Sequence, residues 1–180
     1  MKSDTVETQW PLRVRDEQPH DREQVRIVNE AAFERSDEAD LIDRLRDEGV
    51  VLASFVAEVD GKIVGHILFS RMTVETAHGP VAAVSLAPMA VHPDYQRRQA
   101  GSSLVRHGLT ELRARGERIV IVLGHKDYYP RFGFSPEKAR DLASPFPPEA
   151  FMALELEDGA LDGIRGEVRY ARAFGLDANG

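Results

Sequence analysis

The sequence first shows possible chemistry at two arginines that precede a helix. A mostly apolar run at residues 84–91 is followed by a polar stretch at residues 95–101, which contains Arg97 and Arg98. Apolar residues then recur at helical spacing over residues 104–112. A helix N-terminus leaves backbone N–H groups without intrahelical partners, and these groups attract anions. The pattern therefore predicts an anion site in a loop between a strand and a helix.

A second feature lies further along the chain, after a short apolar segment. Residues 119–123 are all apolar, which is typical of a buried parallel strand, and the loop 124–127 follows its carboxyl end. Ligands of open α/β sheets bind at such ends. His125 lies in this loop, and a histidine can exchange protons near neutral pH. We consider His125 a candidate general base, with an ordinary loop histidine as the alternative.

Three motifs in order resemble the GCN5-related N-acetyltransferase (GNAT) family. Residues 96–101, QRRQAG, resemble its motif Q/R-x-x-G-x-G/A, and residues 86–93 resemble its fourth strand. Residues 129–134 match its signature Y-x-x-x-G-F. The segments LGHxxYYxRFGF and GxVRY resemble a bacterial subgroup of the family, so that the resemblance covers nearly the whole chain.

The resemblance implies that acetyl-CoA is the cosubstrate and that its pyrophosphate lies at the loop and helix start. It also implies that a bulge at Pro88 separates two strands, and that the gap admits the pantetheine arm; a simple edge distortion is the alternative. A backbone N–H near Met89 or Ala90 would then donate to the reaction's oxyanion. The implied cofactor-binding residues are Met89, Ala90, Val91, Arg97, Arg98, Gln99, Ala100, Gly101 and Ser102.

The resemblance also implies that Tyr129 is the acid that protonates the leaving thiolate. A phenol with a pKa of about 10 protonates a thiolate with a pKa of about 8.5 at a cost of roughly 2 kcal/mol. Tyr128 is the rival acid, and a purely structural aromatic is the other interpretation of Tyr129.

The amine must also lose a proton, which requires a base. Glu34 is the alternative to His125 for that role.

Gln99 occupies the position at which the motif has its first glycine. Glycine is favoured where φ is positive or where a ligand approaches the backbone closely. If φ is positive at Gln99, the side chain costs roughly 1–2 kcal/mol. If the residue belongs to the first helical turn, it costs nothing and its amide still donates. The first alternative makes weakened cofactor binding an expectation to test.

The elements that must position these residues follow from periodicity and turn signals. We expect an α/β fold, a GNAT-like mixed and mostly antiparallel central sheet flanked by helices, with a splayed parallel strand pair that holds the cofactor. The dipeptide Asp60-Gly61 marks a hairpin. The expected strands cover residues 12–15, 54–59, 62–70 with an extension to 74, 81–91, 119–123, 151–156 and 167–171, with a further strand opening at 133–134. The expected helices cover residues 21–33, 37–47, 104–112 and 128–132, and residues 141–150 form a proline-rich surface loop.

Composition limits the class of protein. The 180 residues suit a flexible tail over residues 1–10 and a single N-acetyltransferase-like domain over residues 11–180. The net charge of −7 argues against nucleic-acid and anionic-membrane partners and is compatible with a cationic amine acceptor. No histidine spacing suggests a metal site, and the chain has no cysteine. No apolar run suggests a membrane span or signal peptide, so we expect a cytoplasmic protein.

The sequence thus predicts an acyltransferase that moves an acetyl group from acetyl-CoA to a primary amine. Direct transfer is expected because no cysteine can carry an acyl group. The acceptor stays open between a small amine or amino acid, an aminoglycoside-like molecule, and a protein N-terminus or lysine; a homodimer is also allowed. The alternatives are a catalytically silent domain that binds CoA or another ligand, and an unrelated α/β phosphate-binding protein.

Overall fold

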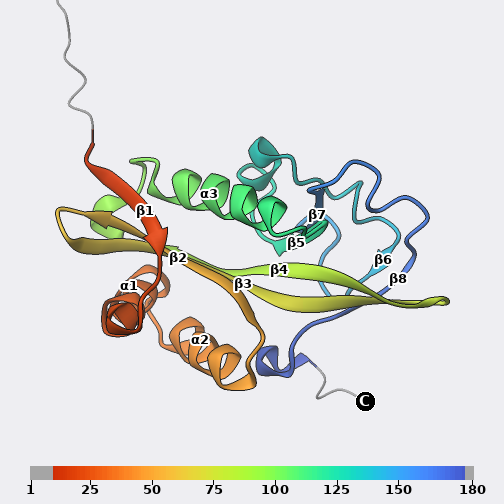
Figure 1. The fold of residues 1–180 in the computed structure, drawn as a ribbon, viewed down its shortest axis with the longest axis horizontal. Coiled ribbons are helices and arrows are strands. Elements are labelled where there is room, and N and C mark those ends of the chain that lie inside the picture. Colours follow the sequence, from red (N-terminus) through yellow and green to blue (C-terminus); the bar gives the residue numbers. More distant parts are fainter. Residues whose placement is uncertain (1–9, 177–180) are drawn as a thin grey trace, which may run out of the picture.

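A mixed sheet runs through the computed structural model, which describes residues 10–176 (Figure 1). Its strand order is β1-β2-β3-β4-β5-β7, and every neighbouring pair is antiparallel except the parallel pair β4–β5. Helices α1 and α2 lie on one side of the sheet and α3 lies on the other (Figure 1). This arrangement confirms the fold class expected from the sequence. Within residues 10–176, no helix is long and apolar enough to cross a membrane.

The bounds of the elements follow the expected order closely. The strands are β1 (Leu12–Asp16), β2 (Val51–Val59), β3 (Lys62–Thr76), β4 (Gly79–Val91), β5 (Ile119–Leu123), β6 (Leu142–Ala143), β7 (Phe151–Glu155) and β8 (Gly166–Arg169). The α-helices are α1 (Arg22–Phe33), α2 (Asp37–Glu48) and α3 (Ala100–Ala114). Short 3-10 helices are η1 (Pro19–Asp21), η2 (Pro93–Tyr95), η3 (Tyr129–Phe132) and η4 (Arg172–Phe174). Most of the expected tail, residues 1–9, lies outside the described residues, whereas Trp10 packs against Tyr95.

Two expectations for the C-terminal third were wrong. Residues 133–134 do not open a strand, because Gly133 ends η3 at a φ of 99° and only Ser135 forms an isolated bridge to Ala153. The next residue is Pro136, which has no N–H to continue a ladder. The loop 141–150 also contains the short strand β6. Strand β8 pairs with β3 and β6, so it does not extend the sheet beyond β7.

The parallel strands β4 and β5 separate soon after they meet. Their pairing is limited to Val84 and Ser85 on β4, which lie opposite β5. Just beyond, Ala87 and Pro88 together face the single residue Leu68 on β3, so β4 contains a bulge. The bulge re-aims the end of β4 away from β5 and leaves that end without a strand on one side. The structure therefore has the splayed pair that the resemblance implied.

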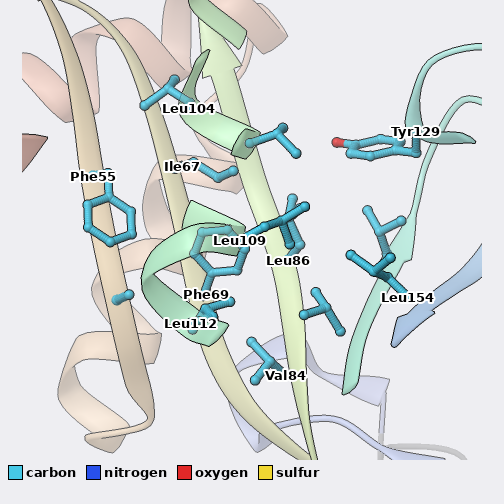
Figure 2. Packing of buried hydrophobic residues seen from close by; sticks show 14 of the residues in the cluster. Phe55, Ile67, Phe69, Val84, Leu86, Leu104, Leu109, Leu112, Tyr129 and Leu154 are labelled. Atoms are coloured by element: carbon cyan, nitrogen blue, oxygen red, sulfur yellow. The ribbon is translucent and has the colours of Figure 1, made fainter. Parts of the chain in front are cut away.

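Helix α3 is held against the sheet by close packing. Leu104 and Leu112 are fully buried on this helix, facing the strands that carry Phe55 and Phe69 (Figure 2). A Cβ built on Gly108 would lie 2.4 Å from the Phe69 ring, so only glycine allows the ring this close to the helix. Since α3 begins at the predicted anion site, this packing fixes the position of its N-terminus.

A buried polar network holds α1 and α2 on the opposite face. Asn29 of α1 donates to Nδ1 of His66 on β3 (3.3 Å), which places the imidazole proton on Nε2, 2.8 Å from the Ser54 hydroxyl. Ser54 in turn donates to Glu17, which also pairs with Arg46 of α2. Burial lowers the pKa of His66. Burial acts to raise the pKa of Glu17, but hydrogen bonds from His66 and Ser54 outweigh it, and the pKa is lowered.

We expect Gly108→Ala to destabilise the protein although alanine favours helices. The methyl group must displace the Phe69 ring, and overpacking costs roughly 1–3 kcal/mol against a helix-propensity gain of about 1 kcal/mol. The urea midpoint should therefore fall. Thr110→Ala, at an exposed position of the same helix, should leave the midpoint unchanged or raise it slightly. An unchanged midpoint for Gly108→Ala would contradict the packing described here.

Candidate active site

A cleft of about 900 Å³ opens where β4 and β5 separate. It passes through the plane of the sheet, because its walls come from helices on both faces (Figure 1). On one face the walls are the start of α3 and the loop that follows β5. On the other they are the end of α1 and the start of α2, and the bulged end of β4 lies between. The principal lining residues are Phe33, Glu38, Leu41, Met89, Ala90, Val91, Arg97, Gln99, Ala100, Gly101, Ser102, His125, Tyr128, Tyr129 and Arg131.

The N-terminus of α3 lies at one end of this cleft. The first intrahelical bond runs from the Ser103 amide to the Gln99 carbonyl (2.9 Å). The amides of Ala100, Gly101 and Ser102 precede that bond, and they are the donors that a helix start presents to an anion. Arg97 also lines the cleft and adds a positive charge. The residues and geometry here fit a pyrophosphate group.

The two arginines of the loop have different surroundings. Arg98 is absent from the cleft lining, and its guanidinium lies over the Trp10 ring, 4.8 Å from the ring centroid. Trp10 packs in turn against Tyr95. The contact is a cation–π interaction that fastens the chain's N-terminal segment to the loop. Of these two residues, only Arg97 therefore lines the cleft.

The sequence left open whether φ is positive at Gln99, and the structure shows that it is. Its φ is 66° and its ψ is 7°, so it caps α3 in the left-handed region. Arg97 is left-handed too, with a φ of 62°. A non-glycine residue in this region costs roughly 1–2 kcal/mol. The strain lies in the loop itself, and the amides of the helix start keep their direction.

The bulged end of β4 presents backbone groups to the cleft. The His92 amide donates to the Val64 carbonyl of β3 (2.8 Å). Backbone groups alternate in direction along an antiparallel strand, so Ala90 also faces β3, whereas Met89 and Val91 face away from β3 into the gap. The Val91 carbonyl accepts a bond there from the Gln96 side chain (3.0 Å). Of the two candidate oxyanion donors, Met89 rather than Ala90 therefore has its N–H on the cleft side.

Tyr129 is held rigidly at the wall opposite β4. Its ring lies so close to Gly124 that a Cβ there would be 2.2 Å from the ring, and it packs edge-on against Phe134. Only 8% of the residue is exposed, and its hydroxyl points toward β4 (Figure 2). Burial raises the pKa of Tyr129 above its ordinary value, with a smaller contribution from Tyr128. The phenol therefore keeps its proton at physiological pH and can act as a donor.

Tyr128 reaches a different part of the same cleft. Its hydroxyl lies near the start of α3, where a Cβ built on Gly101 would be only 2.9 Å away. The Arg131 guanidinium stacks over its ring at 4.7 Å. The second motif glycine thus permits a close approach between the loop after β5 and the helix start. This position places the Tyr128 hydroxyl beside the start of α3.

The base candidates also differ in position. His125 is exposed and lines the cleft, and its carbonyl accepts the amides of Tyr128 and Tyr129. Glu34 ends α1 and does not line the cleft. Glu38, which the sequence analysis did not single out, is the one carboxylate among the described lining residues. The sequence feature that could have drawn attention to Glu38 is its position in the first turn of a predicted helix, three residues before the apolar Leu41. Within residues 10–176, no group of three His, Asp or Glu is placed to hold a metal ion.

Comparison with known proteins places this site in a family. The profile described as an acetyltransferase (GNAT) domain matches residues 13–136. The chain is 42% identical over 134 residues to the uncharacterized N-acetyltransferase YjhQ of Escherichia coli, which covers 72% of this chain and 74% of that protein. It is 33% identical over 166 residues to the uncharacterized N-acetyltransferase YhbS of the same organism, covering 91% of this chain and 98% of that protein.

Solved structures agree with these matches. The crystal structure of Escherichia coli YhbS in complex with CoA has a TM-score of 0.86 at 32% identity, covering 92% of this chain and 93% of that chain. A GNAT family acetyltransferase from Brucella melitensis in complex with acetyl-CoA has a TM-score of 0.76 at 33% identity, covering 91% and 97%. Fold, motifs and relatives together define an N-acetyltransferase. The chain belongs to the GNAT family, as its three motifs implied.

Charge reversal should separate the two arginines. We expect Arg97→Glu to weaken acetyl-CoA binding by at least about tenfold, because a charged hydrogen bond is worth about 1.5–3 kcal/mol and the new carboxylate repels the phosphates. Arg98→Glu should change the affinity less than about threefold, since that side chain lies over Trp10. Isothermal titration of each folded variant measures both effects. Equal losses in the two variants would show that Arg98 also reaches the cofactor.

Removing the Gln99 side chain should relieve strain without loss of the site. We expect Gln99→Gly to raise the free energy of unfolding by about 0.5–1 kcal/mol, which is the left-handed penalty less the added entropy of glycine. Acetyl-CoA affinity should stay within about threefold because the backbone amide is kept. Gln99→Ala is the matched control, since it removes the side chain and retains the strain. A large loss of affinity in both variants would show a needed side-chain contact.

Proposed function

We propose that this chain transfers the acetyl group of acetyl-CoA to a primary amine by direct attack. The observation that carries the proposal is the single cleft through the sheet. It joins the start of α3 to Tyr129 across the gap between β4 and β5. The structures of YhbS with CoA and of the Brucella protein with acetyl-CoA support the choice of cosubstrate.

The residues of the cleft fit the parts of acetyl-CoA. The amides of residues 100–102 and the Arg97 side chain would bind the pyrophosphate. The Met89 backbone groups and the Val91 N–H, which face the gap, would pair with the amides of the pantetheine arm. An extended arm can pair there much as a strand does. The thioester would then lie beyond the bulge, between Met89 and Tyr129.

The chemistry requires that charge and protons be handled at three atoms. The neutral amine attacks the thioester carbonyl, and the oxygen that becomes negative accepts a hydrogen bond from the Met89 N–H. As the carbon–sulfur bond breaks, the thiolate takes the proton of the Tyr129 hydroxyl. The proton that the amine loses leaves through His125 or through water at the cleft mouth and restores the phenol. Because the sequence has no cysteine, no acyl-cysteine step precedes this attack.

The test is release of free CoA thiol when the protein is given acetyl-CoA and a panel of amines. Thiol release that depends on the amine supports the transferase. Binding of acetyl-CoA without release for any amine would favour a silent CoA-binding domain. Absence of binding, with no thermal shift at saturating acetyl-CoA, would reject the cofactor site altogether. A ligand at about 100 times its Kd stabilises by about 2.7 kcal/mol, so the shift is easily measured.

Tyr129→Phe should lower kcat by about 100-fold and leave acetyl-CoA affinity unchanged, since general acid catalysis contributes about 10²–10⁴. Tyr128→Phe is the control and should have a much smaller effect on kcat. The phenol is active when protonated and burial raises its pKa. Wild-type activity should therefore not fall between pH 9 and pH 10 through loss of this proton. Equal kcat values for Tyr129→Phe and wild type would reject the acid role.

A further inference from the structure

The end of the cleft opposite α3 is lined by apolar side chains and one carboxylate from α1 and α2. The cleft is lined from both faces of the sheet, and α1 and α2 cover the face opposite α3 (Figure 1). A cofactor that enters beside α3 would then direct its acetyl group toward the face of α1 and α2. An acceptor must approach from that face. The walls there are apolar at Ala32, Phe33 and Leu41, and the only charged lining residue from these two helices is Glu38.

Glu38 is built into this wall as a cation-binding carboxylate. Its side chain is 14% exposed and holds the guanidinium of Arg35 through both carboxylate oxygens, with contacts of 2.5–3.2 Å. The hydrogen bond from Arg35 lowers the pKa of Glu38, which keeps the carboxylate charged. The Arg35 side chain is 60% exposed. Because its guanidinium is exposed, Arg35 would be hydrated after turning outward, and the carboxylate would then be left to a cation of the substrate.

The reacting amine is a poor partner for this carboxylate. It must be neutral to attack, and a nearby carboxylate would favour its protonated form. A second positive group on the same molecule has no such conflict. Phe33 and Leu41 offer an apolar surface for the carbon chain that joins the two groups. An acceptor with a distal carboxylate would instead meet the negative charge of Glu38.

We infer that Glu38 selects acceptors in which an aliphatic chain joins the acetylated amine to a second cationic group, as in an aliphatic diamine. This inference rests on the proposed acetyl transfer and adds the substrate class. Glu38 is a specificity residue in this scheme, because it binds the distal charge and does not touch the reacting atoms.

The experiment compares amines that share a carbon chain. Pentylamine, 1,5-diaminopentane and 5-aminopentanoate differ only in the distal group, which is neutral, cationic or anionic. With wild type, kcat/KM from CoA thiol release should be about tenfold higher for the diamine than for pentylamine, beyond the factor of about two for its second amine. The value for 5-aminopentanoate should be lowest.

Glu38→Gln should remove this preference while preserving the shape of the wall. We expect KM for the diamine to rise about tenfold, with kcat/KM for pentylamine and the thermal shift with acetyl-CoA unchanged. Asp37→Asn is the matched control. Asp37 lies in the same helical turn and also contacts Arg35 (3.7 Å), but it is 74% exposed and does not line the cleft. This variant should keep the full preference.

The outcomes separate this inference from the proposed function. Equal kcat/KM for the diamine and pentylamine, or a preference that survives Glu38→Gln, overturns the role of Glu38 while acetyl transfer stands. Turnover of some other amine class in place of the diamine would also overturn the role of Glu38 while acetyl transfer stands. Failure of every amine to release thiol overturns the proposed function, and the substrate class with it.

Discussion

The structure depends on one constraint, the separation of β4 from β5 after two residue pairs. A backbone N–H or carbonyl that is buried without a partner is costly, so strand edges inside a protein are normally paired. Here the bulge at Ala87 and Pro88 turns the end of β4 away from its neighbour. The Met89 and Val91 backbone groups therefore have no strand partner on that side, and of these the Val91 carbonyl accepts a bond from the Gln96 side chain. The other groups line the cleft, where a ligand rich in amides could pair with them.

Two close approaches that only glycine allows define the walls of this opening. Gly101 admits the Tyr128 hydroxyl at the start of α3, and Gly124 admits the Tyr129 ring at the end of β5. The two neighbouring tyrosines are thereby directed to different ends of one cleft. Burial then keeps Tyr129 protonated, while Tyr128 lies beside the group of amides that attracts anions. The same short loop can therefore contribute to both binding and proton transfer.

Much of this arrangement could be predicted from local sequence. Asp60-Gly61 marked the hairpin, and the apolar periodicity marked α3 and β5, because these signals act between near neighbours. The position of β8 could not be predicted, since its pairing with β3 depends on contacts distant in sequence. The cation–π contact of Arg98 could not be predicted either, because its partner Trp10 lies far away in the chain. Glu38 was missed because its place in the cleft depends on which wall α2 forms, and the spacing to Leu41 does not show which site that wall faces.

The two ends of the cleft differ in the charged groups that line them, and the sheet lies between them. Arg97 and the start of α3 are positive, whereas Glu38 is the only carboxylate on the described lining. Exposed charges are screened within about 8 Å at physiological ionic strength, so each end acts separately on what approaches it. An anionic cosubstrate and a cationic acceptor would thus be attracted to different faces and would not compete. The network of Asn29, His66, Ser54, Glu17 and Arg46 ties α1 and α2, which form one wall of the cleft, to the sheet. Both substrates can then be held at once, which is the condition that direct transfer requires.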